Sequence, residues 1–342
     1  MPQFDADLLV VGGGPAGLAT ALHARRAGMS VIVMEPRPSP VDKACGEGLM
    51  PGGLAALKEL GVDPDGWPLR GIAYLDGSGD GSRAEAVFRG GPGRGVRRLE
   101  LHACLAERAR AAGTQWVCGR AGEVGQDASG VLANGIRARW MVAADGLHSS
   151  VRRKLGVNAR PGSPRRFGVR RHFGTKAWSE FVEVWWSSSG EAYVTPVSEG
   201  VVGVAILGGG RVGLESFPGL ARRLAGAPVL GATRGAGPLR QVVARRVRGR
   251  VLLVGDAAGY EDALTGEGIS LALRQAGAAV SALVADDPGR YEAAWRRITR
   301  EYRWLTRGLV LATVPLVARR AIVPLSARLP GVFGAIVNRL AR

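Results

Sequence analysis

Lysine is scarce in this chain of 342 residues: it has four lysines, so arginine makes up nearly all of the 46 basic residues. The 29 acidic residues leave a net charge of +17, a value typical of proteins that bind nucleic acid or anionic membranes. The arginines are scattered, however, and the sequence shows neither a basic stripe interleaved with aromatic residues nor a nucleic-acid-binding motif. We therefore expect no nucleic-acid partner and attribute the arginine excess to a compositional bias.

Cysteine and histidine are also rare. The three cysteines, Cys45, Cys104 and Cys118, lack the spacing of a metal or redox pair, and the four histidines lack the spacing of metal ligands. This pattern argues against a disulfide framework and predicts no metal site. No apolar run reaches about 18 residues, so no spanning helix is expected, and the N-terminus lacks the pattern of a secretory signal. We therefore expect a cytoplasmic protein.

The stretch that organises the rest of the sequence lies at its N-terminus. Residues 7–11 predict a short buried strand, from which a glycine-rich turn leads into a helix. The turn contains Gly12, Gly14, Pro15, Ala16 and Gly17, and its glycines have the G-x-G-x-x-G spacing. Glycines so placed allow a tight turn, the close approach of a pyrophosphate and close packing of helix on strand. Glu35 ends the next apolar run, where an acid can accept from a ribose 2′-OH, so the motif predicts a dinucleotide site.

The remaining sequence alternates between two kinds of pattern. Buried strands of the parallel type and amphipathic helices occur at 98–112, 137–144, 251–254 and 266–284. Alternating segments joined by turn residues occur at 70–89 and 165–207 and predict an antiparallel sheet. We expect an α/β fold in which a Rossmann-type dinucleotide-binding domain (1–70, 96–160 and 245–285) is interrupted by an antiparallel-sheet substrate domain (71–95 and 161–244). Residues 286–342 predict a helical C-terminal segment that is broken at Pro315, Pro324 and Pro330.

Two later stretches complete a three-part signature. Asp145 and Gly146 follow one buried strand, and Gly255 and Asp256 follow another. The second stretch continues to Thr265, Gly266, Gly268 and Ile269, where a helix begins. In this order and spacing the motifs resemble those of the flavoprotein hydroxylase and geranylgeranyl reductase superfamily, which has the para-hydroxybenzoate hydroxylase fold. The resemblance extends to about residue 285 and implies that the bound dinucleotide is FAD.

The residues themselves agree with this resemblance. Asp256 follows a strand of an α/β sheet, where ligands collect, and its carboxylate can accept from a ribityl hydroxyl. Thr265 and Gly266 open a helix whose N-terminal N–H groups can face the negative N1/O2 edge of a reduced flavin. By resemblance, Asp145 and Gly146 lie near the pyrophosphate and near a nicotinamide donor. An ordinary turn at Asp145 and a helix cap at Asp256 are the alternatives.

The loop from Lys43 to Pro51 resembles the stretch beside the isoalloxazine ring in the geranylgeranyl-reductase branch. Its glycines, Gly46 among them, would let the backbone lie against the ring, and Lys43 could neutralise a phosphate or the reduced flavin. Cys45 lies near the ring by resemblance, whereas a lone cysteine is more often inert packing. Arg98 stands at the start of a helix and, by resemblance, reaches the phosphate or ribityl part of the cofactor. A surface arginine is the alternative.

The interpretation that we favour from the sequence is an FAD-dependent monooxygenase. NAD(P)H would reduce the flavin, and oxygen would then form a C4a-hydroperoxide that hydroxylates an aromatic polyketide or phenolic lipid. The donor would bind transiently, because the sequence has no second G-x-G-x-x-G unit. The antiparallel sheet would bind this apolar substrate through Phe181, Trp185, Tyr193 and Pro196. No side chain is identified as a catalytic group.

Three alternatives stay open. One is a reductase that saturates isoprenoid double bonds, although Thr195 stands where prenyl reductases carry an aromatic residue. Another is a membrane-associated flavin-binding module without catalysis, and the third is a protein that binds only NAD at the first motif. A halogenase is not expected, because Trp185 and Trp186 do not provide the Trp-x-Trp-x-Ile-Pro segment of flavin halogenases.

The C-terminal tail has seven arginines and no acidic residue between Arg303 and Arg342. Apolar residues, with Trp304 among them, are interspersed with the arginines. One interpretation is a set of helices packed on the core with solvated arginines. The other is an amphipathic basic surface that makes a peripheral contact with an anionic membrane.

Overall fold

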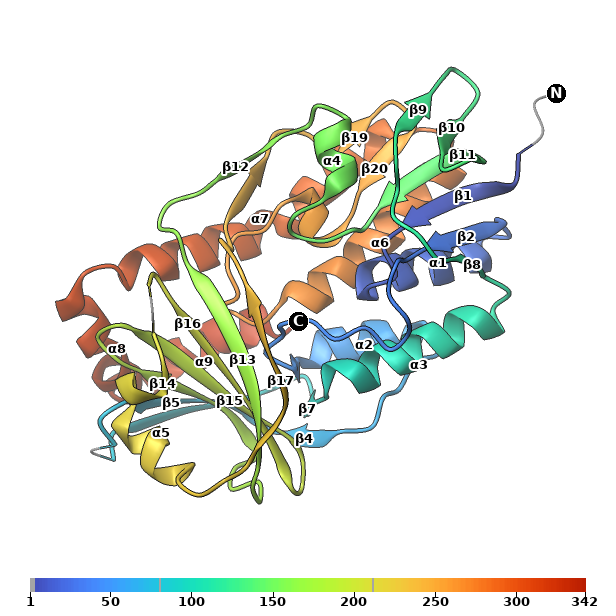
Figure 1. Cartoon of the computed structure of the whole chain (residues 1–342). Helices are drawn as coiled ribbons and strands as arrows, with labels where there is room; N and C mark the ends of the chain where they lie inside the picture. Colours follow the sequence, from blue (N-terminus) through green and yellow to red (C-terminus); the bar gives the residue numbers. More distant parts are fainter. Residues whose placement is uncertain (1–3, 80, 211) are drawn as a thin grey trace.

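The structure is a computed structural model that describes residues 4–79, 81–210 and 212–342 (Figure 1). Two large sheets dominate it, one at the upper right of Figure 1 and the other at the lower left. Helices from the N-terminal, middle and C-terminal parts of the chain cover them. The expected α/β architecture, with a second sheet inserted into a Rossmann-type unit and with C-terminal helices, is confirmed.

The first sheet contains the predicted parallel strands. Its order is β19 (Val247–Arg248), β20 (Val251–Leu253), β11 (Ile136–Ala143), β1 (Ala6–Val11), β2 (Val31–Met34) and β8 (Gln115–Val117), and β9 (Val124–Gln126) and β10 (Val131–Ala133) extend it from β11. The strands from β20 to β8 are parallel. Their apolar runs are buried because α1 (Pro15–Arg26), α3 (Arg98–Ala111) and α6 (Gly268–Val284) share one core with them.

The parallel arrangement gathers the predicted cofactor motifs at one edge of this sheet. The segments after β1, β2, β11 and β20 hold, in turn, the glycine turn, Glu35, Asp145 and Gly255. Because the carboxyl ends of parallel strands meet at the same edge, residues far apart in the sequence converge there.

The second sheet is mainly antiparallel. Its order is β17 (Val229–Ala236), β13 (Phe167–Gly174), β16 (Val201–Gly208), β15 (Gly190–Ser198), β14 (Phe181–Trp186), β5 (Gly71–Asp76) and β6 (Arg83–Val87). The hairpin of β5 and β6 is confirmed, but β5 pairs with β14 in parallel. These two strands come from separate insertions, so no short turn forces them to run antiparallel. The edge strand β17 was not predicted, because its largely exposed sequence lacks an apolar alternation.

Helices cover both faces of the second sheet. A 3₁₀ turn, η1 (Leu214–Ser216), leads into α5 (Pro218–Arg223) on one face. The other face is packed against side chains of α7 (Gly289–Ala312), α8 (Leu316–Arg328) and α9 (Pro330–Leu340). Pro315 and Pro330 lie at helix starts as predicted, but Pro324 lies inside α8, so the expected break there was wrong. Proline removes one helical hydrogen bond, and packing on the sheet can outweigh that loss.

Shorter elements join the two sheets. They are β3 (Gly48–Leu49), α2 (Pro51–Glu59), β4 (Trp67–Leu69), β7 (Gly93–Gly95), α4 (Ser150–Lys154), β12 (Ala159–Pro161), β18 (Gln241–Val243) and the 3₁₀ turn η2 (Gly255–Ala258). The strand β7 pairs with β3 and β4, and β12 pairs with β18. The two ranges assigned to the substrate domain supply the strands of the second sheet, while the domain boundaries themselves stay a prediction.

Candidate functional site

The glycine turn after β1 owes its shape to two glycines. Gly12 has a φ of 106°, and a Cβ there would lie 2.5 Å from the carbonyl oxygen of Ala144. A Cβ at Gly17 would lie 1.8 Å from the carbonyl oxygen of Gly12. A side chain at either position would therefore push the turn away from the strand or the helix beside it.

The middle glycine of the motif faces open space instead. A Cβ at Gly14 would meet only Arg98 Nη2, at 3.8 Å, among the described atoms. Pro15 and Ala16 follow as the first turn of α1, and no described side chain caps this helix N-terminus. Unpaired N–H groups at a helix start, next to open space and a cation, are suited to bind a phosphate.

Glu35 closes one side of the turn. Its buried carboxylate accepts hydrogen bonds from the Gly13 N–H at 2.9 Å and from Arg37 Nε at 2.7 Å. Burial alone would raise the pKa of Glu35, but these donors outweigh burial and hold the pKa below its ordinary value. The structure thus places a charged carboxylate beside the turn, and its contact with a ribose stays a prediction.

Lys43 and Asp256 meet at the same sheet edge, with Nζ and Oδ2 2.9 Å apart. Burial opposes ionisation of Asp256, but Lys43, followed by Arg98 and Arg152, lowers its pKa below the ordinary value. Gly146 has a φ of 83°, and a Cβ there would lie 3.3 Å from Lys43 Nζ. The structure therefore brings the residues predicted after β2, β11 and β20 to one charged centre.

Asp145 has a structural role on one side only. Its Oδ2 accepts from the N–H groups of Ser150 at 2.7 Å and Val151 at 3.1 Å, so it caps the start of α4, a role that neither the predicted cofactor contact nor the ordinary turn included. Its buried Oδ1 has no partner among the described residues. Gly255, with a φ of 65°, lies against the first turn of α1, because a Cβ there would be 2.8 Å from the Cβ of Ala16.

Arg98 is a buried cation without an anionic partner among the described residues. It begins α3, it is 8% exposed, and its Nε has no hydrogen-bond partner among the described residues. Burial lowers the pKa of Arg98, an effect that the Asp256 carboxylate partly offsets. The comparably buried Arg152 differs, because its guanidinium donates to the carbonyl oxygens of Leu147 and Ala257 at 3.0 and 2.9 Å. Arg98 is thus charged, buried and available for a ligand.

The loop before β3 lies between the two sheets. Burial raises the pKa of the Cys45 thiol, so this group is neutral, and its sulfur accepts from the Glu47 N–H at 3.4 Å. No described atom lies within 4 Å of a Cβ built at Gly46, so the backbone there faces free space. Thr195 Oγ1 donates to the Gly46 carbonyl oxygen at 2.9 Å, which anchors the loop on β15. Thr195, the residue that departs from the prenyl-reductase pattern, therefore has a structural role, because its hydroxyl holds this loop on the second sheet.

The start of α6 lies in the same region. Gly266 has a φ of 71°, Gly268 is the first helical residue, and no described side chain caps the helix. Ile269 is half-buried and packs against the core of the first sheet. Thr265 Oγ1 lies 3.1 Å from Thr306 Oγ1 of α7, so the predicted threonine contacts the C-terminal helices as well as the turn.

One functional pair escaped prediction. Glu47 has a φ of 61°, is 2% exposed, and accepts from the Arg98 N–H at 2.8 Å and from His172 Nε2 at 2.6 Å. Arg170 Nη1 lies 3.0 Å from His172 Nδ1, and because arginine only donates, the hydrogen of His172 must be on Nε2. Arg170 also pairs with Asp42. Glu47 is part of the loop from Lys43 to Pro51, but its partner His172 follows 125 residues later, and no sequence pattern links the two residues.

The predicted substrate residues do not share a face of the second sheet. Phe181 and Trp185 pack in the core beneath α5, and Pro196 lies in register with a core residue of that face. Tyr193 packs on the opposite face, where its hydroxyl donates to the Leu264 carbonyl oxygen at 2.6 Å. Only Tyr193 therefore reaches the turn that precedes α6.

The face of Tyr193 carries an apolar wall that the sequence reasoning missed. We define the apolar wall as Ile72, Tyr74, Val184, Trp186, Tyr193 and Leu264, which pack together under side chains of α7 and α8. The alternation within β14 already separates Val184 and Trp186 from Trp185, so the sequence signalled two faces. It gave no sign of which face lies towards the cofactor motifs.

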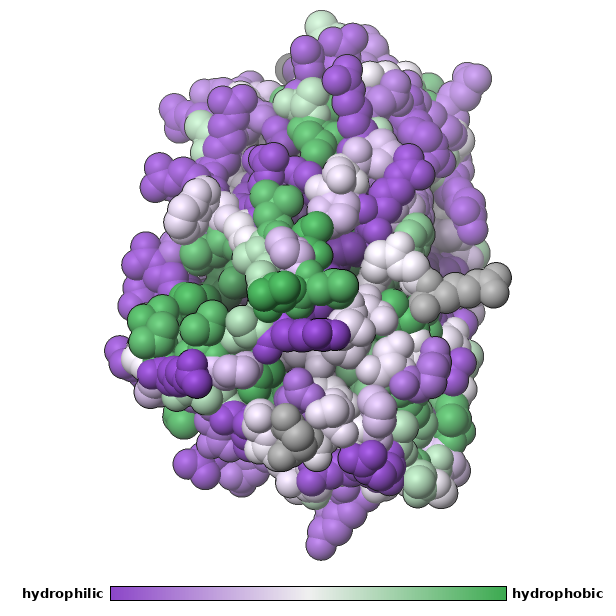
Figure 2. Space-filling view, turned by 90° about the vertical axis from the view of Figure 1, so that its left-hand side faces the viewer, coloured by the Kyte–Doolittle hydropathy of each residue, from purple (hydrophilic) through white to green (hydrophobic). Residues whose placement is uncertain are grey.

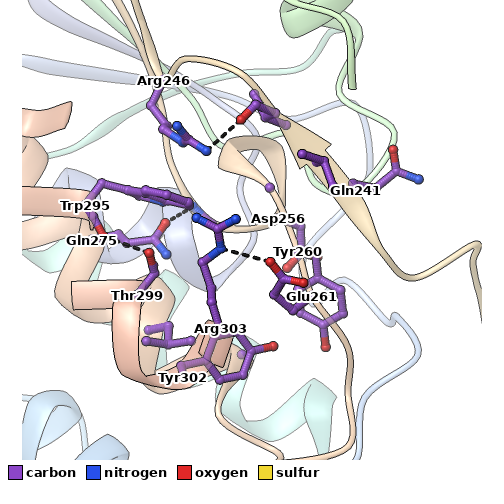
Figure 3. Close-up of a pocket in the computed structure, with 16 residues that line it drawn as sticks. Gln241, Arg246, Asp256, Tyr260, Glu261, Gln275, Trp295, Thr299, Tyr302 and Arg303 are labelled. Atoms are coloured by element: carbon purple, nitrogen blue, oxygen red, sulfur yellow. Dashed lines mark hydrogen bonds and ion pairs between the residues drawn. The ribbon is translucent and has the colours of Figure 1, made fainter. Parts of the chain in front are cut away.

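A pocket adjoins the turn that begins at Gly255, between η2, α6 and α7 (Figure 3). The Gly255 N–H donates to Gln275 Oε1 at 2.9 Å. Arg303 extends from α7 towards Glu261, with Nε and Oε1 2.8 Å apart, and its guanidinium lies 5.3 Å from the ring centre of Trp295. These contacts hold the turn that begins at Gly255, and the segment after it, against α6 and α7.

The residues at the sheet edge fit the pyrophosphate of a dinucleotide. The open space over Gly14, the uncapped start of α1 and the unpaired Arg98 supply room, N–H donors and a cation. The free backbone at Gly46 and the uncapped start of α6 supply a second open region for the opposite end of such a molecule.

Comparison with known proteins agrees with this geometry. Residues 5–204 match the model of the FAD binding domain family. Digeranylgeranylglycerophospholipid reductase 1 of Methanopyrus kandleri is 32% identical over 342 residues, which cover 87% of this chain and 88% of that protein. Menaquinone reductase of Mycobacterium tuberculosis is 38% identical over 165 residues, but this alignment spans only 40% of that protein and 44% of this chain.

A third relative and a solved structure add to the comparison. The 6-methylpretetramide 4-monooxygenase of Streptomyces rimosus is 37% identical over 174 residues, which cover 44% of this chain and 41% of that protein. The halogenase PltM in complex with phloroglucinol and FAD has a TM-score of 0.79 over 98% of this chain and 82% of that chain, at 14% identity. The last likeness shows the fold alone. From its sequence match and its fold, the chain belongs to the FAD-binding domain family, within the FAD-dependent oxidoreductases.

Proposed function

We propose that the protein reduces carbon–carbon double bonds in the isoprenoid chain of a lipid, with FAD as cofactor and NAD(P)H as a transient donor. One observation carries this choice. The alignment with the Methanopyrus reductase runs through both sheets and most of the chain, whereas the alignment with the Streptomyces monooxygenase covers less than half of it. A match that includes the substrate sheet bears on the substrate, while a match to half of the chain bears mainly on the cofactor.

The chain's own residues would hold FAD as follows. The start of α1 and Arg98 would bind the pyrophosphate, and Glu35 the adenosine ribose. Asp256 would accept from a ribityl hydroxyl once Lys43 turns to a phosphate or to the reduced ring. The Gly46 backbone and the start of α6 would border the ring, and FAD would supply the hydride for the double bond.

The apolar wall supports an aliphatic substrate. Its side chains form a carbon surface packed under α7 and α8, where the Tyr193 hydroxyl donates to the Leu264 carbonyl oxygen and Trp186 Nε1 has no partner among the described residues. A hydrocarbon chain that entered between this wall and the two helices would gain hydrophobic stabilisation from the carbon surface on both sides. Glu47 and His172 would act as positioning residues, because they fix the loop that contains Cys45 and Gly46.

Hydroxylation of an aromatic substrate is the second candidate. The identity with the Streptomyces monooxygenase and Thr195, the residue that departs from the prenyl-reductase pattern, favour it. Oxygen dependence separates the two reactions. We expect a lipid with unsaturated isoprenoid units to accelerate NAD(P)H oxidation equally with and without oxygen. Acceleration only by an aromatic substrate, and only with oxygen, would support hydroxylation, and bound FAD without any acceleration would support a binding module.

A further inference from the structure

The C-terminal helices carry an apolar surface that the fold leaves uncovered. Half of the large apolar side chains that are exposed in the described part of the chain lie between residues 304 and 332. We call them the tail surface: Trp304, Leu311, Val314, Leu316, Val317, Leu325, Leu329 and Val332. Figure 2 looks onto the side of the molecule where α8 lies in Figure 1 and shows apolar side chains gathered there among hydrophilic ones.

The shape of this region makes the surface convex. The helices α7 and α8 meet at a bend of 115° around Thr313, Val314 and Pro315. Val317, in the first turn of α8, is 82% exposed, and Trp304 in α7 is 75% exposed. No single described helix is long and apolar enough to span a membrane, whereas α7 and α8 satisfy that test together across their bend. Leu311, Val314, Leu316 and Val317 thus project at this corner, and the other members of the tail surface lie along the helices on either side of it.

The charge around the corner has one sign. Arg307, Arg320 and Arg328 are exposed and form no ion pair with any described residue. Residues 303–342 contain no acidic side chain at all. An exposed apolar surface with a tryptophan and a surplus of arginine is complementary to an anionic lipid surface.

The tail surface also adjoins the apolar wall. Leu309 and Ile322, half-buried in α7 and α8, pack against the cluster that contains Trp186 and Leu264. Leu264 directly precedes Thr265 at the start of the α6 turn. A continuous apolar layer therefore connects the exposed corner with the residues next to the predicted ring site.

We propose that the tail surface docks the protein on an anionic lipid bilayer, with the corner between α7 and α8 inserted among the acyl chains at the interface. The arginines lie at the level of the headgroups, where they contact lipid phosphates. This docking does not depend on the reaction at the flavin. It places the apolar wall close to the bilayer, where a lipid substrate is dissolved.

The test is co-sedimentation of the FAD-loaded full chain with phosphatidylcholine vesicles, with and without phosphatidylglycerol. We expect binding that requires the anionic lipid and weakens with salt. The triple variant Arg307→Gln/Arg320→Gln/Arg328→Gln should lower the partition coefficient roughly fivefold for each arginine. The double variant Val314→Asp/Val317→Asp should lower it at least roughly tenfold for each site, because each removes an inserted side chain.

Matched control variants distinguish a specific loss of membrane docking from a general effect of lower net charge or of impaired folding. The variant Arg26→Gln/Arg120→Gln/Arg248→Gln removes three exposed arginines elsewhere, and Val229→Asp changes an exposed valine on β17. Both controls should bind vesicles like the unaltered protein, and all variants should retain FAD.

Two results would overturn the proposal. One is equal binding by the control and tail-surface variants. The other is formation of a dimer through the tail surface, detected by light scattering, without vesicle binding. Turnover of a detergent-dispersed substrate should be unchanged in the tail-surface variants, so loss of docking and failure of the proposed reaction give different outcomes.

Discussion

Replacing Arg98 with methionine tests whether a buried, unpaired arginine is kept for the cofactor. Without FAD, Arg98 is 8% exposed and has no anionic partner among the described residues, so its charge stays poorly compensated. Methionine fills similar space without a charge, and exchange of buried charge for apolar volume is often neutral or stabilising. We therefore expect the apoprotein of Arg98→Met to be unchanged in stability or about 1–2 kcal/mol more stable.

The same change should weaken the cofactor complex. Hydrogen bonds to a charged group contribute about 1.5–3 kcal/mol, which corresponds to a loss of FAD affinity of roughly 10- to 150-fold. Fluorescence titration of the apoprotein with FAD measures the affinity, and thermal denaturation with and without FAD measures the two stabilities.

Arg152→Met is the matched control, because Arg152 is also buried but donates to two carbonyl oxygens. Its loss leaves those carbonyls unpaired and should destabilise the apoprotein by about 1–3 kcal/mol for each. If Arg98→Met lowered apoprotein stability like the control and bound FAD normally, the assignment of Arg98 to the cofactor would be refuted.

Three further tests, with four substitutions, follow from the same structure. Gly17→Ala should prevent folding, because its Cβ would lie 1.8 Å from a carbonyl oxygen, whereas Gly14→Ala should fold normally and lose FAD affinity. Circular dichroism measures the folding of both variants and FAD titration their affinity, and equal behaviour would contradict the assigned roles. Glu47→Gln places an amide NH2 group against one of the two donors, the Arg98 N–H or the His172 Nε2–H, and should cost about 1–3 kcal/mol in urea unfolding, with a shifted flavin spectrum. An unshifted spectrum would argue against loop positioning. Burial raises the pKa of Glu267 to about 8 in the folded state. Above the lower pKa of the unfolded state, the folded protein therefore holds one proton more at Glu267 than the unfolded chain does. As a result, the contribution of Glu267 to the free energy of unfolding falls as pH rises towards 8. Glu267→Gln should flatten that fall in a series of thermal melts, and an unchanged slope would contradict it.

Much of the cofactor site was predictable because local rules determine it. The spacing of Gly12, Gly14 and Gly17 is a local sequence pattern, and in the structure Gly12 and Gly17 closely approach carbonyl oxygens while Gly14 faces open space. Asp145 and Asp256 could be placed from the rule that the carboxyl ends of parallel strands share an edge. The structure adds that Asp145 also caps α4, a role that the motif alone did not separate from ligand binding.

The substrate side was less predictable because it depends on distant pairings. Choosing between Trp185 and Trp186 required knowing which sheet face lies under α7 and α8, and periodicity within β14 does not contain that information. The contact between Glu47 and His172 joins two segments that only the tertiary fold brings together. Pro324 stays inside α8 because packing on the sheet overrides the local preference for a break.

The proposed reaction is the reduction of an isoprenoid double bond by this FAD-dependent protein. The most direct measurement is mass spectrometry of the lipid after anaerobic incubation with the FAD-loaded protein, NAD(P)H and a lipid that carries unsaturated isoprenoid units. We expect a product that has gained two hydrogen atoms for each double bond reduced. An unchanged lipid under anaerobic conditions, together with a substrate that gains one oxygen atom when oxygen is admitted, would contradict it.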